Sequence, residues 1–175
     1  RYTPGTKIYW DPRSQAPPAA DGTWETCIVS CPDFDTLQTV YQWLRSGQHP
    51  FVSVVIDSLM EAQKRCIDAV VGLEMLQTQD WGTLLRRLEA LVRSYRDLTL
   101  IPTNPVGCVV LLVGTINQEG TYRPLLQGQL KLTVPYYLDV VAYMFMAPSP
   151  EGGFSRCLLV APQPGFVAKD GTGNR

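Results

Sequence analysis

The feature that most constrains the fold is the apolar run FVSVVI at residues 51–56, which ends abruptly in Asp57. An almost unbroken apolar run of this length predicts a strand that is buried on both faces, as in a parallel sheet. Asp57 then lies at the carboxyl end of the strand, where open α/β sheets bind their ligands. A single carboxylate there suits Mg²⁺, which binds few protein oxygens and keeps several waters. The same residues also allow a simpler interpretation, in which the Asp caps the following helix.

A second apolar run, CVVLLV at residues 108–113, predicts another buried strand. Helices are expected between the two runs, at residues 59–76 and 81–97. The second of these helices has one apolar stripe at helical spacing, with its arginines off the stripe. Alternating strands and helices predict a parallel α/β sheet with right-handed crossovers. We therefore expect residues 52–57 and 108–113 to be adjacent central strands, with the 81–97 helix packed on one face.

The segment before the first run contains two short strand candidates, residues 7–10 and 24–30, on either side of a Pro-rich loop. Asp33 can cap a helix that follows, because apolar residues then recur at helical spacing until Gly47.

The segment after the second run changes character. Residues 115–135 are polar with little periodicity, and a connection of this length in a compact domain is usually functional or mobile. Residues 136–146 and 156–161 then predict two strands paired as a hairpin. Residues 162–175 form a Gly- and Pro-rich tail.

Length and composition indicate one ordinary globular domain. The chain has 175 residues, of which 45% are apolar and 18% charged, and its net charge is −1. Without a global basic field, any nucleic-acid binding requires a local patch. No apolar run is long enough to cross a membrane, and the odd number of cysteines favours reduced thiols in a cytosol. The single histidine and the five cysteines do not form a zinc-binding pattern.

Several short motifs occur in an order that resembles one family. They are YQWLRSG (41–47) leading into VVIDSL (54–59), WGTLLRRL (81–88), Gly114-Thr115, Arg123-Pro124 with LQG (126–128), Pro135 before LDVV (138–141), and FVAKD (166–170). In this order and spacing the chain resembles the RecA-like nucleotide-binding ATPases of bacteriophages, a group that includes recombinases associated with single-strand annealing. The resemblance covers the chain from about Cys31 to Gly173.

The resemblance implies a fold class and a function. The fold would be α/β, a RecA-like P-loop NTPase core with a mostly parallel sheet flanked by helices and a C-terminal β-hairpin. Residues 1–175 would form a single RecA-like ATPase domain that lacks its N-terminal P-loop segment. The function would be the binding and hydrolysis of ATP in phage DNA recombination or single-strand annealing, in the host cell cytoplasm.

The resemblance also implies a nucleotide site for ATP and Mg²⁺. Asp57 would hold the metal through water, and Ser58 would support it. Thr115 or Asn117, just beyond the neighbouring strand, would sense the γ-phosphate. Lys169 in the tail would reach the nucleotide of a neighbouring subunit.

A DNA-binding loop is implied as well. In the family a mobile loop after this strand faces single-stranded DNA, and here it would span residues 116–134. Arg123 and Lys131 would be its cations, and Tyr122 a stacking side chain. The alternative is a plain surface connection with two scattered charges. With a net charge of −1, we expect measurable affinity only in a homo-oligomer, a ring or a filament, where several loops line one path.

Two departures from the family pattern leave alternatives open. The sequence has no G-x-x-x-x-G-K-[ST] loop, which would hold the phosphates. Either that segment is missing from this chain, or the protein is a non-catalytic RecA-like assembly or DNA-binding module without nucleotide turnover. The family's catalytic glutamate is also absent near the 7–10 strand, where Asp11, a shorter acid beside a proline, is the candidate. An unrelated α/β enzyme lacks support, since the chain has neither G-x-S-x-G nor G-x-G-x-x-G.

Overall fold

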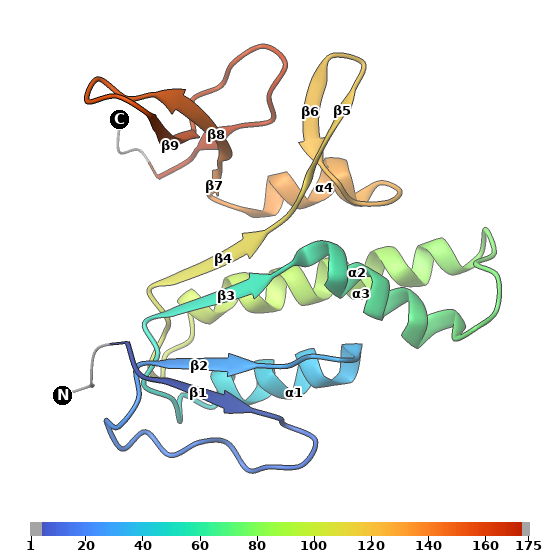
Figure 1. The fold of residues 1–175 in the computed structure, drawn as a ribbon. Helices are drawn as coiled ribbons and strands as arrows, with labels where there is room; N and C mark the ends of the chain where they lie inside the picture. Colours follow the sequence, from blue (N-terminus) through green and yellow to red (C-terminus); the bar gives the residue numbers. More distant parts are fainter. Residues whose placement is uncertain (1–4, 173–175) are drawn as a thin grey trace. The chain divides into compact units, whose positions relative to one another are not determined.

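The computed structural model describes residues 5–172, which divide into two compact units, one up to Leu112 and one from Val113 onward. The first unit contains, in chain order, β1 (Lys7–Trp10), β2 (Thr26–Val29), α1 (Phe34–Arg45), β3 (Ser53–Asp57), α2 (Leu59–Val71), α3 (Asp80–Arg96), the 3₁₀-helix η1 (Asp97–Thr99) and β4 (Cys108–Leu112) (Figure 1).

The strands of the first unit form two parallel ladders. β1 pairs with β2, and β3 pairs with β4 in the register that places Ser53 opposite Cys108 and Asp57 opposite Leu112. The arrows of these four strands run in the same direction in Figure 1. The prediction that residues 52–57 and 108–113 are parallel neighbours is therefore confirmed. The prediction that both are central strands is wrong, because in the described part of the chain their ladder has only these two strands.

The predicted fold class, a RecA-like core with an extended and mostly parallel sheet, is wrong. Every ladder found within residues 5–172 has two strands, and three of the five are antiparallel. The run at 51–56 is not buried on both faces either, since the side chain of Val55 is 57% exposed whereas that of Ile56 is 8% exposed. The physical reason is that an apolar run indicates that a strand tends to be buried. The run does not specify which other strands pair with the two edges of that strand.

The three helices of the first unit supply most of its core. Asp33 caps α1 as predicted, because its Oδ1 accepts hydrogen bonds from the backbone N–H and the hydroxyl of Thr36, both at 2.7 Å. The hydroxyl of Tyr95 in α3 donates to the carbonyl oxygen of Leu37 in α1 at 2.8 Å and ties the two helices together. The apolar stripe predicted for α3 is buried at Leu84, Leu88, Leu91, Val92 and Tyr95.

Two helix boundaries differ from the sequence expectation. α2 ends at Val71, and its C-cap Gly72, with a φ of 61°, closes the helix before residue 76. The N-cap of α3 is Gln79 and not Asp80, whose carboxylate instead accepts from the backbone N–H of Gln77 at 2.7 Å.

The second unit has the elements β5 (Thr115–Gln118), β6 (Thr121–Pro124), α4 (Leu130–Tyr137), β7 (Val140–Val141), β8 (Tyr143–Pro148), β9 (Phe154–Leu159) and β10 (Lys169–Asp170). β8 and β9 form the predicted antiparallel hairpin, and β7 pairs with β10. The continuous strand predicted at 136–146 is wrong, because Tyr136 and Tyr137 belong to α4 and the strand that follows is divided into β7 and β8. The polar connection expected at 115–135 is instead an antiparallel hairpin, β5–β6, followed by α4.

The turn of the β5–β6 hairpin explains that difference. Glu119 and Gly120 both have positive φ, 51° and 78°, as in the two-residue turns that match the twist of antiparallel strands. The side chain of Asn117 accepts from the backbone N–H of Gly120 at 3.1 Å and braces the turn. Glu-Gly is a weaker turn signal than Asn-Gly or Asp-Gly, so the pattern of the sequence alone did not indicate a hairpin here.

An aromatic cluster organises part of the second unit. The rings of Tyr122 and Phe166 stack with centroids 5.0 Å apart, and Tyr143 packs against both rings. The backbone supports the cluster, since the N–H of Tyr122 donates to the carbonyl of Gly165 at 2.7 Å and its carbonyl accepts from the N–H of Val167 at 3.2 Å. The tail segment around Phe166 is thereby held alongside β6.

Candidate functional site

The carboxyl end of β3 leads directly into α2. Asp57 is the last residue of β3, and the next residue, Ser58, is the N-cap of α2. The hydroxyl oxygen of Ser58 accepts from the backbone N–H of Glu61 at 3.4 Å. Since Ser58 caps the helix, the exposed carboxylate of Asp57 is not used as a cap. The simpler sequence interpretation, in which Asp57 caps the helix, is therefore wrong.

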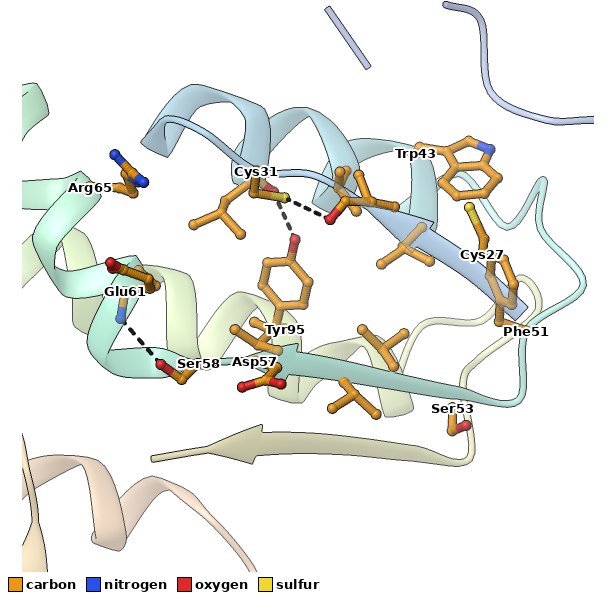
Figure 2. Close-up of a pocket in the computed structure, with 18 residues that line it drawn as sticks. Cys27, Cys31, Trp43, Phe51, Ser53, Asp57, Ser58, Glu61, Arg65 and Tyr95 are labelled. Carbon is orange, nitrogen blue, oxygen red and sulfur yellow. Dashed lines mark hydrogen bonds between the residues drawn. The ribbon is translucent and has the colours of Figure 1, made fainter. Parts of the chain in front are cut away.

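A cavity of about 250 Å³ opens beside this strand end, between β2 and β3 (Figure 2). Its walls come from β2, α1, β3, the first two turns of α2, and α3. The lining residues are Cys27, Val29, Cys31, Leu37, Val40, Trp43, Leu44, Phe51, Ser53, Val54, Val55, Ile56, Asp57, Ser58, Glu61, Ala62, Arg65 and Tyr95. Most of these side chains are apolar, and the charged ones come from the end of β3 and the start of α2.

The cavity brings together charged residues that sequence reasoning missed. Glu61 and Arg65 lie on α2, within two turns of Asp57, and both line the cavity. Glu61 forms an ion pair with Lys64 at 3.4 Å, and Arg65 lies 3.9 Å from the carboxylate of Asp68. The pattern Ser58-x-x-Glu61 is a capping-box signature, so the sequence does contain a signal that places Glu61 in the first turn after the strand.

Two cysteines also face the cavity. Cys27 belongs to β2, and Cys31 follows it. Burial raises the pKa of Cys27, and burial together with the negative charge of Asp33 raises the pKa of Cys31 to about 11. Both side chains are therefore thiols, not thiolates, near neutral pH.

Asp11, the candidate catalytic acid, lies just beyond β1 and does not line the cavity. The guanidinium of Arg13 donates to both of its carboxylate oxygens, at 3.0 and 3.2 Å. These hydrogen bonds hold the pKa of Asp11 below its usual value. The carboxylate of Asp11 is thus already neutralised by a local partner.

The candidate γ-phosphate sensors belong to the second unit, whereas Asp57 belongs to the first. Thr115 opens β5, opposite Pro124, and Asn117 lies two residues further along the same strand. Both residues are exposed, and the side chain of Asn117 is engaged with the hairpin turn.

The candidate DNA-binding residues also lie in the second unit. Tyr122 and Arg123 belong to β6 and Lys131 to α4, an element that packs against β6. All three side chains are half-buried, and the ring of Tyr122 already stacks on Phe166. Lys169 is half-buried in β10, opposite Val141 of β7.

Residues 5–172 hold no group of three or more His, Cys, Asp or Glu side chains arranged to bind a metal ion. Within the same range, no helix has both the length and the apolarity that a membrane span requires.

Comparison with known proteins found no relative. No protein-family model, no curated protein and no solved structure matches the chain.

Proposed function

We propose that the protein binds ATP with Mg²⁺ at the carboxyl end of β3 and hydrolyses it while acting on single-stranded DNA, in phage recombination or single-strand annealing in the host cell cytoplasm. The observation that carries the proposal is the exposed carboxylate of Asp57 at the rim of a cavity, directly before the N-terminus of α2.

The donor set at this rim fits a Mg²⁺-phosphate group. The carboxylates of Asp57 and Glu61 repel phosphate, but they attract Mg²⁺, which binds carboxylate and phosphate oxygens together. The N-terminus of α2, which begins at Leu59, favours negative charge through the dipole of the helix. Arg65 adds a cation on the same cavity wall. Asp57 would hold the metal, Ser58 would support it, and Arg65 would bind phosphate oxygen.

The action on DNA is supported by the two cations of the second unit. Arg123 and Lys131 lie on elements that pack together, so both can contact one phosphate backbone. A net charge of −1 leaves one subunit with little attraction for DNA. We therefore propose that a homo-oligomer, a ring or a filament, is the DNA-binding form, because its repeated weak contacts add through effective concentration.

A second candidate function is a non-catalytic DNA-binding or assembly module. It is favoured by the lack of a G-x-x-x-x-G-K-[ST] loop in these 175 residues and by the pairing of Asp11 with Arg13. Such a module would bind DNA without any dependence on nucleotide.

Calorimetric titration of the protein with ATP, in the presence and absence of Mg²⁺, tests the proposal. We expect weak binding that requires Mg²⁺ and that drops at least about tenfold in Asp57→Asn, because the amide keeps the size of the side chain but loses the charge. Asp35→Asn is the matched control, since Asp35 is also an exposed acid beside a helix N-terminus but does not line the cavity. Equal affinity for ATP in wild type and Asp57→Asn would contradict the assignment of a metal site to Asp57. DNA binding without any ATP binding would favour the second candidate.

A further inference from the structure

The cavity between β2 and β3 has two chemically different ends. Figure 2 shows Arg65 and Glu61 on α2 at one end, and Asp57 and Ser58 where β3 leads into α2. Phe51 and Trp43 stand at the other end, and Tyr95 lies between the two. A ligand that matches both ends would carry its charge at one end and an uncharged aromatic group at the other.

The side walls of the cavity are two strand edges. In the described part of the chain β2 pairs only with β1, and β3 pairs only with β4. Alternate residues of a strand direct their N–H and C=O groups to opposite sides, so each of these strands presents main-chain donors and acceptors toward the cavity. Main-chain polar groups that a bound ligand covers require a hydrogen-bond partner. A flat ligand with donors and acceptors on its rim can satisfy both edges at once.

We propose that the aromatic end of this cavity binds a nucleobase, the planar heterocycle of the nucleotide whose phosphates meet Asp57. This inference deepens the proposed function and rests on it for the position of the phosphates. The base itself needs neither Mg²⁺ nor Asp57, because its contacts are with the strand edges and with the apolar walls. The two parts of the ligand are therefore separable by experiment.

Alkylation of the native thiols tests the base site on the unmodified protein. Cys27 and Cys31 line the cavity, whereas Cys108 lies exposed on β4 outside it and serves as an internal control. Each thiol is followed by mass spectrometry of its peptide during treatment with iodoacetamide. With adenosine at about ten times its Kd, we expect alkylation of the two cavity cysteines to slow about tenfold and that of Cys108 to stay the same. Unchanged alkylation rates at Cys27 and Cys31, measured at the solubility limit of adenosine, would overturn the proposal.

A pair of variants tests whether adenosine protects the two cysteines from alkylation by binding within the cavity. Val54→Phe places a larger side chain in the cavity and should abolish protection by adenosine. Val109→Phe is the matched control, since Val109 is the register partner of Val54 but does not line the cavity. Protection that persists in a folded Val54→Phe protein would place adenosine elsewhere and contradict the proposal.

A second probe separates this inference from the proposed function. Inorganic tripolyphosphate with Mg²⁺ carries the charged end of the ligand without the base, and its binding is measured by calorimetry. Protection by adenosine without binding of tripolyphosphate would support the base site and count against the phosphate site at Asp57. Binding of tripolyphosphate without protection by adenosine would overturn the base site and leave the proposed function standing.

Discussion

Asp57 and Leu112 are register partners at the carboxyl ends of β3 and β4. Because strand residues alternate between faces, the face that carries these two residues also carries Val55 and Val110. Val55 is 57% exposed, Val110 37% and Leu112 41%. The carboxylate of Asp57 therefore stands at the end of an exposed apolar strip.

Ser58 caps α2 whereas Asp57 does not, and measurements of stability can test this difference. Ser58→Ala should lower the free energy of unfolding by about 1 kcal/mol, because the N-cap hydrogen bond is lost. Asp33→Ala should cost a similar amount at the N-cap of α1. Asp57→Ala should change stability by no more than about 0.5 kcal/mol, as is usual for an exposed side chain. Urea unfolding of the three variants provides the comparison, and a loss at Asp57 equal to that at Ser58 would mean that Asp57 has a structural role.

The buried hydroxyl of Tyr95 should make the stability of the protein depend on pH in the alkaline range. Burial raises the pKa of Tyr95, so between its unfolded value near 10 and its higher folded value the folded state holds a proton that the unfolded state has released. Stability should therefore fall as the pH rises through that window. Tyr95→Phe should cost about 1 kcal/mol at neutral pH through the lost hydrogen bond to Leu37, and it should flatten the alkaline decline. An equally steep decline in the variant, measured by urea unfolding at several pH values, would assign the effect to other groups.

The predictable part of the fold is the part that local patterns determine. The stripe of α3 and the cap of α1 depend on residues close in sequence, and both are found as expected. The pairing of β3 with β4 followed from two apolar runs separated by helices. The separation of β2 from β3 did not follow, because a strand's edge partner depends on the packing of whole elements and leaves no mark in the strand's own sequence.

The candidate site divides in the same way. The position of Asp57 at a strand end could be read from the abrupt end of the apolar run. The placement of Arg65 in the cavity could not, since it depends on how α2 lies against β2 and β3. The role of Tyr122 as a stacking residue was an interpretation of a polar segment, whereas in the structure its ring packs within its own unit on Phe166.

The buried ring of His49 should make the stability of the protein depend on pH in the acid range. The ring is 5% exposed, its Nδ1 accepts from the backbone N–H of Phe51 at 3.2 Å, and burial lowers its pKa. Below about pH 6.5 the unfolded chain binds a proton that the folded protein does not, so stability should fall as the pH drops through that value. His49→Asn keeps an acceptor for Phe51 but does not titrate. Because the sequence has no other histidine, the decline between about pH 7 and pH 5 should be flatter in this variant. An unchanged slope in urea unfolding would contradict the assignment.

The turn of the β5–β6 hairpin should respond to its two central residues. Gly120→Ala places a Cβ on a residue with a φ of 78° and should cost about 1 kcal/mol, although no atom lies within 4 Å of the added carbon. Glu119→Asn should stabilise the hairpin, because Asn-Gly is the preferred pair for such a turn. Amide hydrogen exchange of β5 and β6 measures both effects locally. Faster exchange in Glu119→Asn than in wild type would argue against this turn geometry.

The salt dependence of DNA binding tests the role of Arg123 and Lys131. Each cation that contacts a phosphate of single-stranded DNA releases about 0.7 counterion, so the double variant Arg123→Ala, Lys131→Ala should reduce the salt slope by about 1.4 per subunit engaged. Arg156→Ala is a suitable control, because Arg156 is an exposed cation of the same unit on β9. Fluorescence anisotropy with a labelled oligothymidylate, measured across a series of salt concentrations, gives the slopes. The double variant should bind more weakly at low salt and converge with wild type at high salt, where screening removes the contribution of both cations. Identical slopes in the double variant and in wild type would mean that β6 and α4 do not contact DNA.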